Sequence, residues 1–394
     1  MTSPAPSRDG FLAILLIFLR LGLTSFGGPV AHLGYFREEF VARRRWLSEA
    51  AYADLVALAQ FLPGPASSQT GFALGMLRGG LAGGMAAWIG FTMPSAVVMV
   101  LAAYGVDVAL GGTGAGIVHG LKLVAVAVVA QAVWGMAGSL APDRTRATMA
   151  VGAGVALLLL PSAVTQVAVI VVGAGLGLAL CRDGAASAGA PMGFAIGRGP
   201  AVAALVAFAV LLLGLPLLAG AGGMLALAEA GYRAGALVFG GGHVVLPLLE
   251  RSFVPSGWVS ADTFLAGYAV AQAVPGPLFT FGAFLGAAEG GVAGGAVVLV
   301  AIFLPGLLLM YGALPFWDGL RRRPEAQAAL RGVNAAVVGI LLAALFDPIW
   351  LATVRAPADF AIALAAFAAL LLWKVPVWAV VAATAAAGAV AHLA

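Results

Sequence analysis

Two Pro-Gly-Pro motifs interrupt apolar segments of this sequence, QFLPGPASSQT over 60–70 and QAVPGPLFTFG over 272–282. Proline is well placed in the first turn of a helix, so each motif predicts a chain break followed by a new helix. The amides of such an N-terminus point outward with partial positive charge, which suits an anion. The alternative is a kink whose freed carbonyls bond to nearby hydroxyl groups. The recurrence of the break, with a glutamine at the same offset, favours a binding site.

The two breaks differ in the side chains that follow them, because the first is rich in hydroxyl and amide groups and the second has a single hydroxyl. The predicted binding residues are Gln60, Gly64, Ser67, Ser68 and Gln69 at the first break, and Gln272, Gly276 and Thr280 at the second.

Glycine pairs interrupt two further apolar segments, TSFGGPV over 24–30 and VFGGGHV over 238–244. Relative to Ala, Gly costs a helix about 1 kcal/mol and Pro about 3 kcal/mol. The pattern predicts discontinuous helices whose free amides face a substrate, although close packing of helices on glycine is the alternative. The binding residues predicted here are Gly27, Gly28, Gly240, Gly241 and His243.

Three cations in apolar segments are candidates for balancing the charge of an anion. Arg20 and Arg233 each lie six residues before the Phe of a Phe-Gly-Gly motif, and Lys122 aligns with Asn334 in the repeat described below. An ionisable residue within a membrane span is by default a functional candidate. The two arginines are equally compatible with side chains that reach the lipid headgroups.

Asp54 and His243 are candidates for proton coupling, because both could titrate during transport. Asp54 also lies close to the helix start expected at Ser48, where an acid is favourable for structural reasons. The four histidines show no ligand spacing and Cys181 is the single cysteine, so the sequence predicts neither a metal site nor a cofactor.

The composition identifies the kind of protein that must position these residues. Charged residues make up 9% of the 394 positions and hydrophobic residues 62%, with 55 glycines. Soluble domains carry about 25% charged residues. A soluble enzyme, a disordered chain and a nucleic-acid binder are therefore excluded. We expect an all-α polytopic membrane protein.

The chain repeats itself at an offset of 211–213 residues. Besides the breaks, the landmarks are Trp46-Leu47-Ser48 with Trp258-Val259-Ser260 and Pro94 with Pro305. This predicts a tail (1–10), a first transmembrane repeat (11–181), a linker with a connecting helix (182–222) and a second repeat (223–394). The arginine clusters 43–45 and 321–323 occupy non-equivalent loops. If the Pro-Gly-Pro segments are re-entrant, only inverted repeats place both clusters in the cytoplasm. If those segments span the membrane, parallel repeats do. We expect inverted repeats, with helices broken at the Phe-Gly-Gly and Pro-Gly-Pro motifs.

The chain resembles the chromate ion transporter family in its long, two-domain form. The resemblance rests on FGGPVAHLGYFREEFV and RRRWL, QFLPGPASSQ, VFGGGHVVLPLL and YAVAQAVPGPLFTFGAFLG, and it covers essentially the whole chain. It implies export of chromate across the inner membrane, linked to the proton-motive force and conferring chromate resistance, with sulfate as a related oxyanion. The residues carried over are those of the glycine breaks and the Pro-Gly-Pro turns with the polar residues after them.

The leading hypothesis is a secondary active transporter for a tetrahedral dianion, since no ATP-binding P-loop occurs. An anion channel, or a transporter of sulfate or another oxyanion, is the alternative. An intramembrane enzyme acting on lipid headgroups would need a base beside Ser67 or Ser68, and none is evident from the sequence. Protons and membrane lipids are the further partners expected. The Gly/Ala-rich helix faces suit either packing within one chain or a homodimer.

Overall fold

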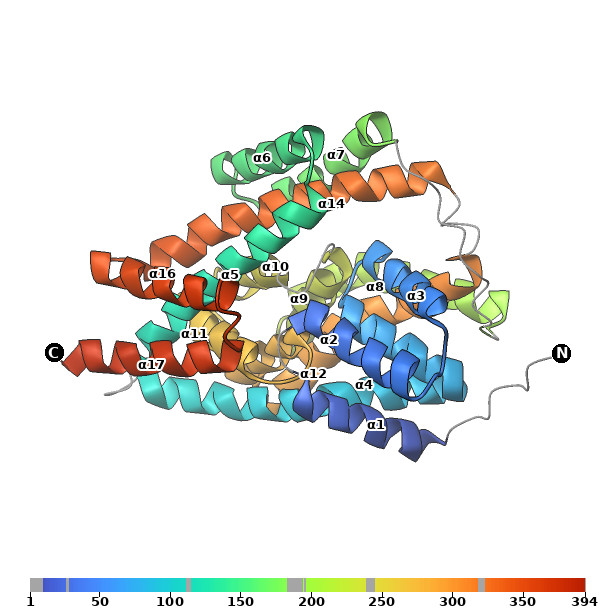
Figure 1. Ribbon diagram of the computed structural model, residues 1–394, viewed down its shortest axis with the longest axis horizontal. Helices are drawn as coiled ribbons and strands as arrows, with labels where there is room; N and C mark the ends of the chain where they lie inside the picture. Colours follow the sequence, from blue (N-terminus) through green and yellow to red (C-terminus); the bar gives the residue numbers. More distant parts are fainter. Residues whose placement is uncertain are drawn as a thin grey trace.

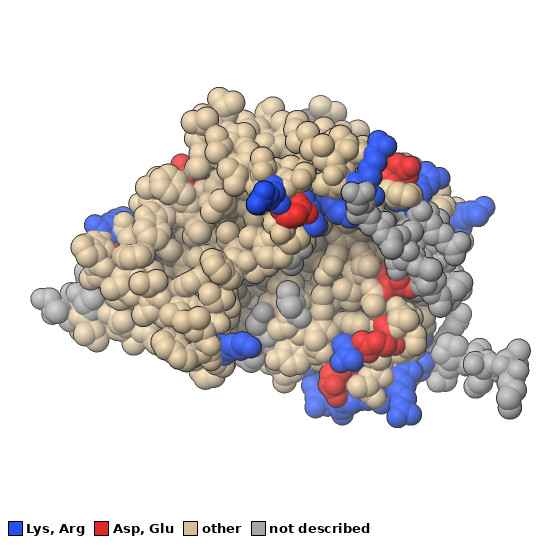
Figure 2. Space-filling model, turned by 45° about the horizontal axis from the view of Figure 1, so that its top comes forward, with Lys and Arg blue, Asp and Glu red and all other residues tan. Residues whose placement is uncertain are grey.

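The computed structural model describes residues 10–25, 28–110, 115–182, 194, 196–238, 245–317 and 323–393, and within these ranges it is helical without a strand. Five of the described helices are long and apolar enough to span a membrane: Ala66–Gly105, Gly116–Gly138, Arg198–Leu218, Leu278–Phe316 and Pro324–Asp347. The face drawn in Figure 2 is largely uncharged, and many large hydrophobic side chains, most of them leucines and valines, are exposed on the described helices. The chain is thus a multi-pass, all-α membrane protein, as its composition predicts.

The first glycine break forms the tip of a helical hairpin. Helix α1 (Phe11–Thr24) ends just before the break, and α2 (Gly28–Phe36) begins just after it and continues into η1 (Arg37–Arg43). Phe18 of α1 packs on Phe36 and on Phe40, with ring centroids 5.7 and 5.0 Å apart. The chain therefore returns over itself, and Ser25 lies at the tip of a re-entrant hairpin.

The first Pro-Gly-Pro motif forms the tip of a second hairpin. Helix α3 (Glu49–Phe61) leads into it, and α4 (Ala66–Leu110) leaves it. The guanidinium of Arg78 lies 5.3 Å from the ring centroid of Trp46, so both open ends of the hairpin are on the same side. At Gly80, where φ is +60°, α4 turns sharply, and its remainder runs on as a long helix.

The second repeat has the same plan. Its elements are α9 (Gly223–Leu237), α10 (Val245–Phe253), α11 (Ala261–Ala273), η4 (Leu278–Thr280) and α12 (Phe281–Ala313), which turns at Gly291 as α4 does at Gly80. The short segments η2 (Ala219–Ala221), η5 (Leu314–Phe316), η6 (Leu345–Trp350) and α15 (Leu351–Thr353) complete the described elements, together with those given below.

The equivalent long segments of α4 and α12 pack against each other in opposite directions (Figure 1). Trp88 lies against Phe303, with ring centroids 5.8 Å apart. Farther along α4, Tyr104 lies beside Gly291, near the start of the long segment of α12. Equivalent membrane-spanning segments that run antiparallel belong to inverted repeats, and this confirms the inverted arrangement.

The two repeats exchange helices at their C-terminal ends. Helix α5 (Ala115–Leu140) packs on α16 (Pro357–Leu371) and α17 (Val377–Leu393) of the second repeat, whereas α14 (Pro324–Ala344) packs on α6 (Arg144–Leu159) and α7 (Ala163–Leu180) of the first (Figure 1). The connecting helix α8 (Arg198–Leu218) covers α9 and α12. Neither repeat can bury its helices without the other.

Lysine and arginine gather toward the right-hand edge in Figure 2. Figure 1 places the starts of α3 and α14 at this edge, and these helices follow Arg43–Arg45 and Arg323. Arg43–Arg45 and Arg323 thus lie at one end of the molecule, as inverted repeats with re-entrant hairpins require.

Candidate functional site

Four hairpin tips meet where α4 crosses α12, and each tip is bonded to the opposite repeat. The Gly64 amide donates to the carbonyl oxygen of Val238 at 2.7 Å, and the Gly276 amide donates to that of Ser25 at 3.0 Å. Gly64 has φ +125° and Gly276 has φ +104°, a region that favours glycine. The Pro-Gly-Pro turn of each repeat is therefore docked on the glycine break of the other.

The crossing helices make room for these turns with small residues at equivalent positions. A Cβ on Gly64 would lie 2.9 Å from the Cα of Gly306 on α12, and a Cβ on Gly276 would lie 2.7 Å from the Ser95 hydroxyl on α4. Both turns thus lie close to the α4–α12 crossing, near the middle of the chain's longest helices.

The start of α4 brings three buried polar side chains to this crossing, Ser67, Ser68 and Gln69, each at most 2% exposed. The amide nitrogen of Gln69 donates to the carbonyl oxygens of Pro63 and Gly306, at 3.0 and 3.1 Å. Two carbonyl acceptors fix the orientation of this amide, so its oxygen is the atom left to face other groups.

Several buried polar atoms around the crossing have no hydrogen-bond partner within the described part of the chain. They are Ser25 Oγ, Ser68 Oγ, Gln69 Oε1, Trp88 Nε1 and Thr92 Oγ1. Leaving such an atom unsatisfied costs about 1–3 kcal/mol. All but the Gln69 oxygen can donate a hydrogen bond, and Ser68 and Gln69 lie in the first turn of α4. This arrangement suits a ligand rich in acceptor oxygens.

His32 joins this group, and the sequence analysis did not identify it as a binding residue. Its ring is fully buried, with Nε2 3.2 Å from the Ser25 carbonyl oxygen and Nδ1 3.4 Å from the Ser67 hydroxyl. The ring also packs edge-on against Phe91. Its spacing to the other histidines carries no signal, but a polar His32 opposite an apolar Val245 in a comparison of the two repeats would have drawn attention to it.

The three predicted cations lie elsewhere or have partners. Arg20 is exposed on α1. Arg233 pairs with the buried Glu229, Nε to Oε1 at 3.0 Å. Lys122 is 5% exposed, and its ammonium donates to a carboxylate oxygen of Asp262, on α11 of the other repeat, at 2.8 Å.

The remaining predicted residues are placed as follows. Gln60 is exposed, and Gln272 is half-buried and hydrogen bonds with Tyr268. The Thr280 hydroxyl donates to the Pro277 carbonyl at 2.8 Å. Asp54 is buried on α3, and Asn334 is half-buried on α14 with its side-chain oxygen unpaired within the described residues. Gly28 begins α2 with φ +78°. Gly27, Gly240, Gly241 and His243 lie outside the described residues.

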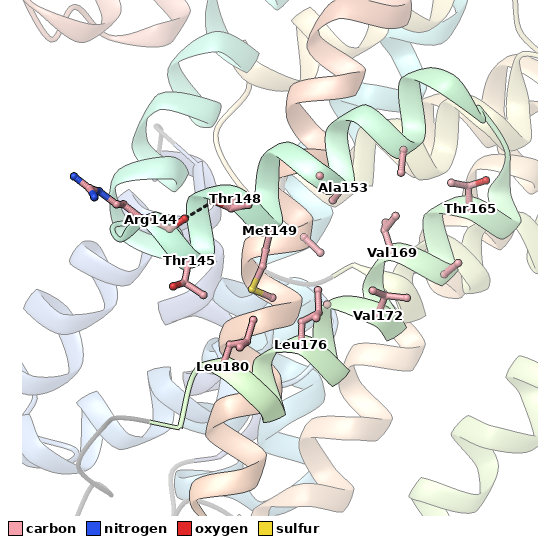
Figure 3. Close-up of a pocket in the computed structure, with 15 residues that line it drawn as sticks. Arg144, Thr145, Thr148, Met149, Ala153, Thr165, Val169, Val172, Leu176 and Leu180 are labelled. Carbon is pink, nitrogen blue, oxygen red and sulfur yellow. Dashed lines mark hydrogen bonds between the residues drawn. The ribbon is translucent and has the colours of Figure 1, made fainter.

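A groove of about 740 Å³ opens between α6 and α7, away from the hairpin tips (Figure 3). Its walls are mainly aliphatic, and Figure 3 shows Met149, Val172 and Leu176 pointing into it while the Arg144 guanidinium points away. A lining of this kind suits hydrocarbon and not a hydrated anion. The buried crossing of α4 and α12 is therefore the better candidate for an anion site.

Comparison with known proteins agrees with the repeat. The sequence model described as chromate transporter matches residues 12–178 and again residues 225–389. The chromate transport protein of Pseudomonas aeruginosa is 29% identical over 388 residues, which cover 95% of this chain and 90% of that protein. That of Cupriavidus metallidurans is 29% identical over 84% of this chain and 81% of its own. No solved structure matches. With the family pattern present in both repeats, the chain belongs to the chromate transporter family.

Proposed function

We propose that this protein is a secondary active transporter that exports chromate across the inner membrane and thereby confers chromate resistance, with sulfate as a second oxyanion. The observation that carries the proposal is the set of buried, unpaired donors at the crossing of the two repeats. A tetrahedral oxyanion presents acceptor oxygens in several directions. The hydroxyls of Ser25, Ser68 and Thr92 and the free amides at the start of α4 supply matching donors.

The site binds its anion mainly through neutral hydroxyl and amide donors and not through charged side chains. Two of the predicted cations are paired with carboxylates and the third is exposed. Neutral donors bind a dianion without forming the tight ion pair that would slow its release. A transported substrate must leave on the other side, so moderate binding suits turnover better than a guanidinium clamp would.

The interlocked hairpins supply a route to alternating access. The polar atoms of the site are closed off from the surface, with Ser67, Ser68 and Thr92 no more than 2% exposed. Entry from either side therefore needs one pair of hairpins to move away from the crossing. Because the repeats are inverted, equivalent movements of the two pairs open the site to opposite sides.

Flux into proteoliposomes tests the proposal. Purified protein is reconstituted, and uptake of chromate and of sulfate is measured with and without an imposed proton gradient. We expect saturable chromate uptake that sulfate inhibits and that the gradient drives against the concentration of chromate. Ser68→Ala should lower uptake about tenfold or more, because a hydrogen bond to an anion is worth about 1.5–3 kcal/mol.

The matched control is Ser256→Ala, an exposed serine beyond α10, which should leave uptake unchanged. Rapid uptake without accumulation would favour an anion channel over a coupled transporter. Uptake of neither anion would contradict the proposal. Unaltered uptake by Ser68→Ala would remove Ser68 from the site.

A further inference from the structure

Among the described residues, His32 is a titratable side chain in direct hydrogen-bond contact with the proposed site. It lies on α2, fully buried, between the Ser25 carbonyl of the first hairpin tip and the Ser67 hydroxyl at the start of α4. The equivalent position in the second repeat is Val245. The first repeat alone thus has an imidazole at this position.

The hydrogen bonds determine which ring nitrogen carries the proton. The Ser25 carbonyl oxygen only accepts, and it already accepts from the Gly276 amide. Nε2, 3.2 Å from that oxygen, must therefore be the protonated nitrogen. In the neutral ring Nδ1 then carries a lone pair, so the Ser67 hydroxyl has to donate its proton to Nδ1 across 3.4 Å. In this state Ser67 offers an anion only lone pairs, which repel it.

Protonation at Nδ1 reverses this bond. The Nδ1 hydrogen then donates to Ser67 Oγ, and the hydroxyl proton of Ser67 is released to donate to an oxyanion at the start of α4. We propose that His32 couples one proton to the anion by reversing its hydrogen bond with Ser67, an inference that rests on the proposed transport function. By linkage, the proton and the anion then each favour binding of the other. The two therefore move in the same direction, and export of a dianion with one proton carries one net negative charge outward, which an inside-negative membrane potential favours.

Other titratable groups on the elements packed against α2 could contribute to a pH dependence. They are Arg20 of α1, Tyr35 of α2 itself, Arg37, Glu38, Glu39 and Arg43 of η1, Glu49, Tyr52 and Asp54 of α3, and Arg78 and Tyr104 of α4. Glu39 pairs with Arg43, and Arg37 with Glu49. Tyr52 donates to the Leu33 carbonyl. Asp54, which is buried, is the group to separate from His32 by experiment.

Binding of sulfate to the purified full-length protein tests this coupling, because sulfate keeps both charges throughout the neutral range. Affinity is measured between about pH 5 and about pH 8, together with proton uptake in weak buffer. We expect wild-type affinity to rise up to tenfold per unit fall in pH, with one proton taken up per sulfate. His32→Gln should remove both effects. Asp54→Asn and the matched control His119→Gln, whose histidine pairs with Asp359, should keep them.

Ser67→Ala gives an independent test, should His32→Gln fail to fold. Ser67 donates to the anion only when the ring is protonated, so its loss should weaken sulfate binding more at low pH than at high pH. An equal loss at both, or undiminished proton uptake by His32→Gln, would overturn the coupling while leaving the transport function in place. If the wild type binds neither sulfate nor chromate, the proposed function fails, and this inference with it.

Discussion

The two repeats share one backbone plan but differ in the side chains that they bring to the crossing. In the first repeat these include Ser25, His32, Ser67, Gln69 and Thr92. The equivalent residues of the second are Val238, Val245, Phe279, Phe281 and Phe303. The first repeat thus supplies the polar contacts, and the second supplies mainly an apolar wall.

This difference separates the features that both repeats need for folding from those that one repeat needs for binding. Both repeats keep the turn glycines and the interrepeat bonds of Gly64 and Gly276, because these hold the hairpin tips in place. Binding chemistry needs only one set of donors, so hydrophobic residues at the equivalent positions of the second repeat are compatible with it. An apolar wall also excludes water and strengthens the hydrogen bonds that an anion makes with the polar side.

The largest effect on stability is expected at Gly64 and Gly276, which have equivalent backbone conformations in the two repeats but different neighbouring residues. Gly64→Ala and Gly276→Ala both place a side chain at positive φ, which costs about 1–3 kcal/mol. The new Cβ at Gly64 also meets the Gly306 backbone at 2.9 Å, whereas that at Gly276 meets the Ser95 side chain at 2.7 Å. Unfolding temperature in detergent should fall for both variants.

Adding Ser95→Gly should restore part of the stability of Gly276→Ala, because it removes the conflicting side chain. Gln69→Ala should not rescue Gly64→Ala, since the Gly306 backbone remains. Ser95→Gly alone serves as the control, with a cost of about 1 kcal/mol for glycine in a helix. If the second substitution changed the unfolding temperature equally at the two positions, the close contacts with Gly306 and Ser95 would not determine the stability of these turns.

The sequence predicts the shared plan well and the difference less well. Breaks at Phe-Gly-Gly and Pro-Gly-Pro and the duplication follow from local patterns that each repeat carries within itself. The inverted arrangement depends in addition on whether the Pro-Gly-Pro segments turn back or span the membrane, which no local pattern decides. The roles of Ser25, Trp88 and Thr92 depend on segments that meet only in the folded chain, so no local pattern marks them. A position-by-position comparison of the repeats would have shown where polar residues face apolar ones.

The predicted cations show the same limit. Lys122 in an apolar segment looks like a free charge, because its carboxylate partner Asp262 is 140 residues away and belongs to the other repeat. Similarly, Glu229 lies one turn before Arg233, but only the structure shows that the two side chains meet. Charge balance within a membrane is a property of the packed helices and not of a single segment.

An intermediate effect on the free energy of unfolding is expected from the Lys122–Asp262 ion pair. The pair has no counterpart, because the equivalent residues are Asn334 and Ala50. Asp262→Asn leaves a buried ammonium without its partner. The cost should be about 1–3 kcal/mol, below that of a fully buried pair because Asp262 is half-exposed. Lys122→Met should cost less, since the carboxylate that remains can be solvated. Unfolding of both single variants and of the double variant measures the coupling, and a purely additive double variant would contradict it.

The smallest effect, on sulfate affinity, is expected at Thr280, whose side chain carries the one hydroxyl that follows the second Pro-Gly-Pro turn. Its proton is already donated to the Pro277 carbonyl at 2.8 Å, whereas the Ser68 hydroxyl at the equivalent position has no partner among the described residues. Thr280→Val keeps the side-chain shape and should change sulfate affinity less than about twofold, against about tenfold or more for Ser68→Ala. Binding titrations on the two variants at one pH compare them directly. Equal losses would mean that both helix starts bind the anion, and the polar and apolar roles of the two repeats would then have to be abandoned.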